Sequence, residues 1–471
     1  MINFLKKGVI ISYILVFSFI FLMMLSGLLG FILIQLRQST EKLAWNESLE
    51  VAEAGINYYR WCINNEAEDQ CEMEKDYLDP SGILVGHFSL EINSKIACGA
   101  TVQRNIVSTG WTAKFPSVKR KISAIYTRES IAKYSYILNN DVWVGADHQI
   151  RGPYQCNGGI RMDGSNQSSV SSAKNEWACN SSFGCSPCPT ANGCHIDGST
   201  CICPGVFTTT ANPRQDLFNF PVPPFDFNGV TIDLAIIKDK ADDYPQDKYW
   251  PPVTTIDAQG KGYHVKFKDN GTIEVWIITR LNSVYGYSLE ENWHYDYFLI
   301  QNEYLYKTVS IDPSCSVYFF EDNLWVEGVV NGTVTMASAN LIDANKDTDI
   351  VLPGNIDYVS LNNTDALGLI GERNILIGPQ SPNNTILRGI FLAQKGRFSR
   401  NHYQNNFRDS LVIYGSIISN GRVGTQWTSS GIVVSGYYKR ESYIDPNMIY
   451  QPPPYVPYLN PQFKMINWEE L

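Results

Sequence analysis

The hydrophobic pattern of the chain begins with an apolar segment long enough to cross a membrane. No charged residue occurs from Gly8 to Leu36, a run of 29 residues, whereas a helix needs roughly 20 apolar residues to cross about 30 Å of hydrocarbon. A cleaved secretory signal has an apolar core of about 7 to 15 residues before a small-residue cleavage site, and this segment has neither property. Lys6 and Lys7 precede the segment. The positive-inside rule therefore predicts a single-pass cell-membrane protein with a cytoplasmic N-terminus and an extracytoplasmic bulk.

Beyond this segment the hydrophobic positions follow a helical period, with no proline in between. They recur at spacings of three and four residues, at Leu49, Ala52, Ile56, Tyr59 and Ile63. This spacing places them on one face of a helix, so we predict one transmembrane and stalk helix over residues 1–66. The face either associates with helices of other chains or packs on the domain that follows. The spacing alone does not choose between these two partners.

Short motifs in the same part of the chain carry a resemblance to a known family. Residues 6–8 read Lys-Lys-Gly, residues 52–55 read Ala-Glu-Ala-Gly, and residues 106–110 read Ile-Val-Ser-Thr-Gly ahead of the basic alternating strand 118–126. With these motifs, about the first 135 residues resemble the PilX-type minor pilin and pilus-assembly family. The resemblance implies a small pilin-like α+β domain after the helix. It also implies pilin or pilus-assembly proteins as partners, and a location in the membrane or the pilus.

One position departs from the pattern of pilins. If a prepilin peptidase cut after Gly8, the fifth residue of the mature chain would be Tyr13, whereas major pilins carry a glutamate there. PilX-like members often lack that acid as well. The departure therefore bears on cleavage of the N-terminus more than on the family resemblance.

Further along, short apolar strands alternate with glycines in a weak internal repeat. Its leading glycines lie 26, 35 and 26 residues apart, at Gly328, Gly354, Gly389 and Gly415, and an earlier copy surrounds Gly152. Such a period is typical of stacked solenoid coils, in which glycine serves where the backbone turns a tight corner. We therefore predict a right-handed parallel β-solenoid, whose coils resemble bactofilin-like polymer-forming solenoids. The alternative is an antiparallel sandwich whose strands contain glycine.

The predicted fold class is mainly β, with the long helix, the small pilin-like domain and the β-solenoid in that order. The copy near Gly152 would join the same stack as the later coils, and the residues between them would form an insertion. The predicted regions are 1–66 (transmembrane and stalk helix), 67–138 (small pilin-like β domain), 139–164 (first solenoid strands), 165–313 (cysteine-rich and aromatic β insertion), 314–440 (β-solenoid) and 441–471 (proline-rich extended tail).

Composition and charge exclude one class of function. A chain of 471 residues with 44% hydrophobic and 13% aromatic residues has room for two or three domains with packed cores. Its net charge is -10 and its pI is near 5.2, and no basic run is longer than residues 119–121. A nucleic-acid-binding surface needs a basic patch, so we predict no nucleic-acid partner.

The cysteines cluster in one short segment. Six of the eleven fall within 25 residues rich in Ser, Gly, Pro and Asn, at Cys179, Cys185, Cys188, Cys194, Cys201 and Cys203. An outward-facing segment so poor in large apolar residues is expected to be stapled by disulfides. Zinc is the alternative, with Cys185, Cys188 and His195 as candidate ligands. The single residue between Cys201 and Cys203 is too short a gap for the usual second ligand pair.

The remaining five cysteines are spread along the chain. Cys62 and Cys71 are close enough in sequence to form a local disulfide, which leaves Cys98, Cys156 and Cys315. Because the total is odd, one of these three must be free or bonded to another molecule if no metal binds and the other thiols are oxidised.

One acidic loop has the spacing of a calcium-binding loop. Oxygen-bearing side chains occupy alternate positions at Asp343, Asn345, Asp347 and Asp349. Calcium loops place their first ligands at this spacing. The loop departs from the EF-hand pattern at Thr348, where glycine is expected, and at Gly354, where a bidentate glutamate is expected. Because of these two departures we predict a solvated acidic turn and no cofactor, with calcium bound at this loop as the alternative prediction.

Motifs for catalysis are missing from the sequence. The six histidines lie in unrelated contexts, outside the motifs of serine hydrolases, zinc proteases and phosphate-binding loops, so we predict no enzymatic activity. The sequence instead predicts a structural cell-surface protein, a minor pilin-like or type IV pilus biogenesis component. The alternative is a membrane-anchored adhesin or carbohydrate-binding β-helix protein with surface polysaccharide as its partner. A polysaccharide-acting enzyme on the solenoid is a third hypothesis.

Overall fold

The fold is described from a computed structural model that places residues 2–65, 70–230, 233–243, 247–343, 345–361, 365–429 and 431–471. The side chains of residues 1–9 lie outside this description, and nothing in it bears on cleavage after Gly8. The chain divides into two compact units. Unit 1 comprises Met1–Lys95, Gln103–Thr127 and Gln462–Leu471, and unit 2 comprises Ile96–Val102 and Arg128–Pro461.

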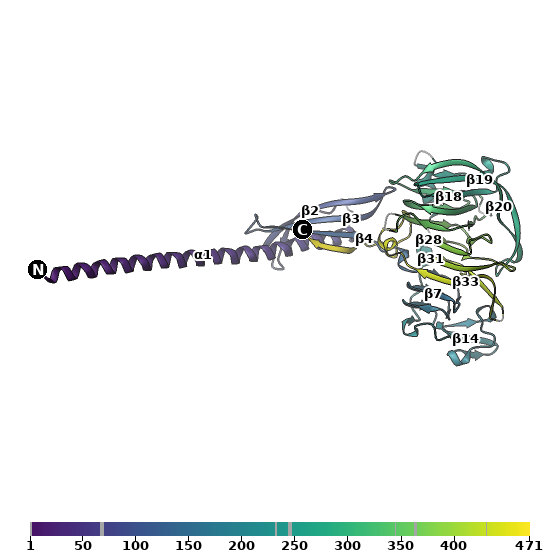
Figure 1. Cartoon of the computed structure of the whole chain (residues 1–471), viewed down its shortest axis with the longest axis horizontal. Helices are drawn as coiled ribbons and strands as arrows, with labels where there is room; N and C mark the ends of the chain where they lie inside the picture. The colour runs from purple at the N-terminus through teal and green to yellow at the C-terminus, as the bar shows by residue number, and fades with distance from the viewer. Residues whose placement is uncertain are drawn as a thin grey trace. The chain divides into compact units, whose positions relative to one another are not determined.

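Unit 1 begins with one uninterrupted helix, α1, over Ile2–Asn65 (Figure 1). Among the described residues it is the one helix long and apolar enough to span a membrane. Its large apolar side chains between Ile10 and Leu36 are exposed. An apolar surface of this length without cover from the chain itself is compatible with lipid or with other membrane helices.

The C-terminal turns of α1 pack on the sheet of the same unit. Ala52, Ile56 and Tyr59 are at most 2% exposed, in a core that they share with strand residues of unit 1, while Leu49 and Ile63 are partly buried against it. The face considered for association with other chains therefore contacts the chain's own sheet. A spacing of three and four residues suits packing on another chain and packing on the chain's own domain equally well. The structure supports packing on the chain's own domain.

The sheet of unit 1 has five strands in the order β1-β2-β3-β4-β34. Their bounds are Glu74–Leu78 (β1), Leu84–Ala97 (β2), Ala100–Thr112 (β3), Lys119–Thr127 (β4) and Lys464–Glu470 (β34). The last strand pairs antiparallel with β4 and covers an edge that would otherwise present unpaired backbone groups. The predicted extended tail over 441–471 is corrected accordingly, because it contains β34 and a short helix, α4, over Pro446–Tyr450.

Two of the motifs that carry the family resemblance, residues 52–55 and 106–110, face each other across the contact between helix and sheet. A Cβ atom added to Gly110 in β3 would lie 2.3 Å from the backbone nitrogen of Ala52 and 2.5 Å from the carbonyl oxygen of Ser48. A Cβ atom on Gly55 would lie 2.4 Å from the Oγ atom of Ser108. Small residues on both elements thus allow α1 to approach β3 closely.

Unit 2 is a β-solenoid whose parallel strands form three stacks. The first stack follows the order Gly262–Lys268 (β18), Leu324–Val330 (β22), Ile356–Tyr358 (β25), Asn384–Ala393 (β28), Phe407–Ser419 (β31), Ile432–Tyr443 (β33), His148–Ile150 (β7) and Ser165–Asn166 (β10). Strands β18, β28, β31, β33 and β7 of this stack lie one above another in Figure 1. Apolar side chains from all three stacks meet in one continuous core.

The second stack shares the long strands β28 and β31 with the first. It follows the order Tyr249–Trp250 (β17), Val317–Phe320 (β21), Thr333–Ser338 (β23), Ala366–Gly371 (β26), then β28 and β31, and then Tyr136–Leu138 (β5), Tyr154–Cys156 (β8), Val170–Ser172 (β11) and Phe218–Asn219 (β16). The third stack contains Ile350–Leu352 (β24), Ile375–Ile377 (β27) and Phe398–Ser399 (β29) at one end, and Val142–Val144 (β6), Ile160–Met162 (β9) and Val206–Phe207 (β15) at the other.

Glycines lie where a strand bends out of one stack into the next. Gly328, Gly389 and Gly415 have φ values of 119°, 147° and 137°, a region that residues with a Cβ atom rarely adopt. Gly389 and Gly415 pair in register on neighbouring coils. Three of the predicted repeat glycines are therefore corner residues, whereas Gly354 and Gly152 are not among the positive-φ glycines.

The early copy of the repeat joins the later coils, since β5 pairs with β31 and β7 pairs with β33. The single insertion predicted over 165–313 is corrected, because β10, β11, β16, β17 and β18 lie inside that range and belong to the stacks. Besides helix α3 (Leu234–Asp243), two described β parts leave the coils. One is the cysteine-rich part, residues 176–204, which has its own small sheet. The other is a long antiparallel hairpin formed by Thr272–Ser288 (β19) and Asn292–Ser310 (β20).

A buried histidine fixes the base of this hairpin to the solenoid. The Nδ1 atom of His264 in β18 lies 2.7 Å from a carboxylate oxygen of Glu303 in β20, and its Nε2 atom lies 3.2 Å from a carboxylate oxygen of Glu327 in β22. Lys266 also contacts Glu303, at 2.6 Å. Burial lowers the pKa of His264, but the hydrogen bond with Glu303 and the nearby Glu327 carboxylate outweigh burial, so the pKa is raised overall.

The stability of unit 2 should consequently fall as the pH rises. A histidine whose pKa is raised by folding contributes its full stability below the ordinary value of about 6.5 and loses it as the pH passes the raised value. We expect His264→Gln to destabilise the protein by about 1.5–3 kcal/mol at pH 6, the range for hydrogen bonds to charged groups, and by less at pH 9. Denaturant unfolding of the full chain in detergent at both pH values measures the difference. His87→Gln is the matched control, since His87 pairs with Asp76 at an exposed site. Equal losses at both pH values would contradict the assignment.

Candidate functional site

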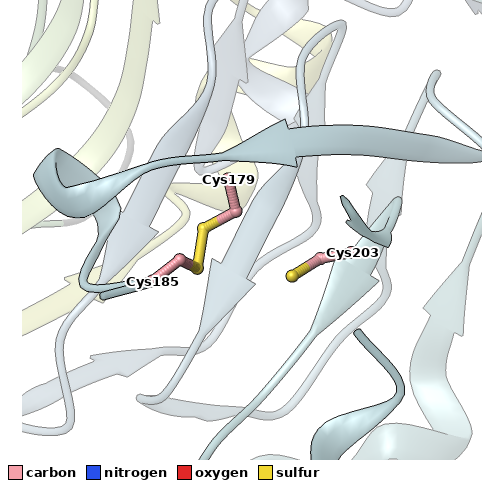
Figure 2. A group of neighbouring side chains, drawn as sticks. All are labelled: Cys179, Cys185 and Cys203. Carbon is pink, nitrogen blue, oxygen red and sulfur yellow. A yellow bond between two sulfur atoms is a disulfide. The ribbon is translucent and has the colours of Figure 1, made fainter. Parts of the chain in front are cut away.

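The cysteine-rich part is a small lobe held together by disulfides. The structure pairs Cys179 with Cys185, Cys188 with Cys201 and Cys194 with Cys203. Figure 2 shows the bond between Cys179 and Cys185, with Cys203 beside it. The sulfurs pack with three aromatic rings, those of Trp177, Phe183 and Phe207. Covalent closure and these rings supply the order that a segment so poor in aliphatic residues lacks.

The same sulfur atoms gather in the way that a metal site would require. Two groups of three sulfurs lie within 4.8 Å, one with Cys179, Cys185 and Cys203 and one with Cys194, Cys201 and Cys203. All five of these residues form disulfides, and zinc is bound by thiolates. His195, the third candidate zinc ligand, is exposed and pairs through its backbone with Ile202 in the lobe's sheet. The oxidised lobe therefore offers no thiolate set for zinc among the described residues.

The other five cysteines form two disulfides and leave one free thiol. Cys62 pairs with Cys71 at the end of α1. Cys98 pairs with Cys315 across 217 residues of sequence, within unit 2. Cys156 is the free cysteine and is buried, and its Sγ atom donates to the carbonyl oxygen of Asn140 at 3.0 Å. Burial raises the pKa of Cys156, so its thiol stays protonated and unreactive at neutral pH.

The acidic loop places its carboxylates next to basic side chains. Asp349 accepts from the Nε and Nη2 atoms of Arg373 at 2.9 and 2.5 Å, and Asp347 lies 2.6 Å from the Nζ atom of Lys395. Asp343 accepts from the backbone and side-chain nitrogens of Asn345. A calcium ion would have to displace these partners, and calcium binding at this loop stays a prediction.

A cleft of about 330 Å³ lies in unit 2 where the two parts that leave the coils come together. The cysteine-rich lobe forms one wall and the turn end of the β19–β20 hairpin forms another. Coil edges and the segment around strand β32 (Gln426–Ser429) complete the lining. Representative lining residues are Ser182, Tyr287, Glu290, Arg397, Arg422 and Trp427. We define this set as the solenoid cleft.

Two of the three arginines that line the solenoid cleft have a carboxylate partner. Arg397 forms an ion pair with Glu290 of the hairpin turn. Arg440 contacts both carboxylate oxygens of Asp147, at 2.7 and 2.6 Å. The two-point pair with Asp147 fixes the guanidinium plane of Arg440, and the ion pair of Arg397 joins the hairpin turn to the coils.

The third arginine has no such partner. The Nη2 atom of Arg422 donates to the carbonyl oxygen of Ser182 at 2.8 Å, and its guanidinium lies over the Phe183 ring at 4.2 Å. No described carboxylate lies within ion-pair distance of Arg422. Burial lowers the pKa of Arg422, while the more distant Glu290 and Asp141 raise it. An arginine is protonated under all ordinary conditions, so this wall of the cleft carries an uncompensated positive charge.

Aromatic rings line the cleft beside this charge. The rings of Tyr287 and Trp427 meet edge to face with centroids 5.5 Å apart. Trp293, which is half exposed, contacts the Tyr287 ring at 5.4 Å, and His402 contacts the Trp427 ring at 5.9 Å. The Nε1 atom of Trp427 donates to the carbonyl oxygen of Arg400, which sets the orientation of the indole.

Sequence reasoning did not find the solenoid cleft. Its wall residues Ser182, Tyr287 and Arg422 are separated by more than a hundred residues each, and they lie in no shared motif. The sequence shows both the cysteine cluster and the aromatic residues of the hairpin, but neither pattern indicates that these two segments lie against each other in the fold. Their meeting depends on the path of the coils.

Comparison with known proteins gives little support for a family. No protein-family model matches the chain, and no curated protein matches it. Among solved structures, the crystal structure of the competence-associated pilin ComZ from Thermus thermophilus aligns at 13% identity, over 91% of this chain and 97% of that chain, with a TM-score of 0.25. A TM-score this low does not define a shared fold. The proposals below therefore rest on this chain's own residues.

Proposed function

We propose that the protein is a membrane-anchored component of a type IV pilus-like filament or of its assembly machinery. In this role the N-terminal half of α1 associates with pilin helices in the membrane or filament, and the solenoid is the displayed part. The observation that carries the proposal is the single helix α1, apolar and exposed from Ile10 to Leu36. The resemblance of residues 6–8, 52–55 and 106–110 to PilX-type proteins adds to it.

The packing within unit 1 restricts which surface can associate. Because Ala52, Ile56 and Tyr59 are buried against the chain's own sheet, the association surface is the apolar part of α1 before Arg37. Helices in a membrane associate by close packing of their side chains, and small residues allow their backbones to approach. Gly27 and Gly30 have nothing within 4 Å of an added Cβ atom, so they are open to a neighbouring helix.

The proposal is for a structural role without catalysis. Glycoside hydrolysis, the chemistry raised for a β-helix, uses two carboxyl groups about 5–9.5 Å apart. Among the described residues that line the solenoid cleft, Glu290 is the one carboxylate, and it is paired with Arg397.

Photo-crosslinking in native membranes tests the role. A photo-reactive residue at Phe21, which is 65% exposed, should form crosslinks to pilins or to assembly-platform subunits, identified by mass spectrometry. A second probe at Lys42, on the exposed side of the stalk, should reach the same proteins if they continue along the helix. The same probe at Lys439, exposed on unit 2, is the control for random encounters. Crosslinks from Phe21 to lipids and to unrelated membrane proteins alone would refute an assembly role.

A further inference from the structure

We propose that the solenoid cleft binds a pyranose sugar that bears a carboxylate, as found in acidic surface polysaccharides. The sugar ring would lie against Tyr287 and Trp427, and its carboxylate would pair with Arg422. This inference goes beyond the proposed assembly role. Every residue involved belongs to unit 2, so the failure of one proposal leaves the other intact.

The construction of the cleft favours a bound ligand over an accidental gap. The cysteine-rich lobe and the hairpin both leave the coils, they are far apart in sequence, and both contribute walls. Two kinds of interaction hold the lobe wall in place, a disulfide and hydrogen bonds from an arginine. The Cys179–Cys185 disulfide encloses residues 180–184, and Arg161 donates to the carbonyl oxygens of Phe183 and Gly184 at 2.9 and 2.7 Å. A volume of about 330 Å³ lies in the range of small-ligand sites, about 300–1,000 Å³.

The aromatic residues suit one face of a sugar. The C–H groups on a face of a pyranose are apolar and slightly positive, and they pack on the negative face of an aromatic ring. Tyr287 and Trp427 are half-buried at the cleft wall and held by their mutual contact and by Trp293 and His402. Rings that are already fixed lose little conformational entropy when a ligand binds.

The charge of the cleft selects an anionic sugar. Arg422 is partly desolvated and lacks a carboxylate partner, and a charge in that setting gains from an anion that can accept two hydrogen bonds from its planar guanidinium. Arg397 and Arg440 are already neutralised by Glu290 and Asp147. The site therefore offers one free positive charge, which fits a single carboxylate. A polyanion such as nucleic acid needs many phosphate contacts and would be repelled by a chain with a net charge of -10.

The ligand class can be tested on the full chain in detergent micelles by isothermal titration calorimetry. The probes are a galacturonic acid tetramer, 3′-sialyllactose and, as a neutral probe, maltotetraose. We expect one or both acidic probes to bind at least tenfold more tightly than maltotetraose. Arg422→Gln should abolish this preference, and Trp427→Ala should weaken binding of every sugar. Arg214→Gln is the matched control, since Arg214 is an exposed arginine paired with Asp216 in the same unit.

A measurement on the unaltered protein guards against variants that fold poorly. Addition of the acidic probe should slow hydrogen exchange in residues 181–184, 286–290 and 422–428. Exchange should be unchanged in Glu176–Cys179 (β12) and Thr200–Pro204 (β14) of the lobe, which do not line the cleft. Absence of binding by both acidic probes would overturn the proposal. It would also be overturned if inorganic sulfate produced the same protection at the same concentration, since the site would then bind anions without recognising a sugar.

Discussion

Replacing Gly415 by alanine is expected to destabilise the solenoid by about 2–6 kcal/mol, the sum of a strained backbone and an overpacked contact. Gly415 has a φ of 137°, which alanine rarely adopts. The added Cβ atom would lie 1.9 Å from the carbonyl oxygen of Gly389 on the neighbouring coil. Because Gly389 is itself a corner residue in register with Gly415, neither backbone can shift without moving the next coil. A loss of this size is a large fraction of the about 5–15 kcal/mol that stabilises a typical domain.

Denaturant unfolding of the full chain, followed by tryptophan fluorescence, measures this effect. Gly424→Ala is the matched control, because Gly424 lies a few residues downstream with nothing within 4 Å of an added Cβ atom and has no positive φ. The control should unfold at the denaturant concentration of the unaltered protein. If Gly415→Ala unfolded with the control, Gly415 would not be a required corner of the coils.

The elements that the sequence predicted well are those with a local signal. The uncharged run from Gly8 to Leu36 predicted the apolar part of α1, because a helix long enough to cross a bilayer carries its apolar surface in one continuous stretch. The repeat predicted the solenoid through its glycines, since three of them mark corners that residues with a Cβ atom rarely adopt. The repeat also placed residues 139–164 in the same stack as the later coils, which the pairing of β7 with β33 shows.

What the sequence could not predict depends on contacts between distant segments. The stripe from Leu49 to Ile63 has the same period whether it meets another chain or the chain's own sheet. Cys98 and Cys315 are separated by 217 residues, and no spacing rule selects that pair from the available thiols. The predicted insertion over 165–313 is too long, because β17 and β18 lack the sequence pattern of the repeat although they extend the stacks. The solenoid cleft was missed for the same reason, since its walls meet only through the folded coils.

The second large effect is expected at Gly110, where the helix and the sheet of unit 1 come closest. The Cβ atom of an alanine would lie 2.3 Å from the nitrogen of Ala52 and 2.8 Å from its Cα atom, and all the atoms that it meets belong to backbone. The helix must then move away from β3, which opens the core around Tyr59 and Ile56. Overpacking of this kind costs about 1–3 kcal/mol and occasionally more, and a small core has little stability in reserve.

Hydrogen exchange of the full chain in detergent, read by mass spectrometry, separates this local effect from general unfolding. Gly110→Ala should speed exchange in residues 44–63 and 104–127, while the coils of unit 2 keep their protection. Gly82→Asn is the matched control, because Gly82 lies in open space with a φ of 82° that asparagine tolerates. Unchanged protection of residues 44–63 in Gly110→Ala would contradict the close contact.

Under the proposed function, the Gly110→Ala variant should keep its crosslinks from Phe21 to pilins, since the apolar part of α1 is unchanged. It should lose crosslinks from Lys42, because the sheet no longer holds that part of the helix. Loss of the crosslinks at both positions would instead mean that the packing of α1 on its own sheet also controls association in the membrane.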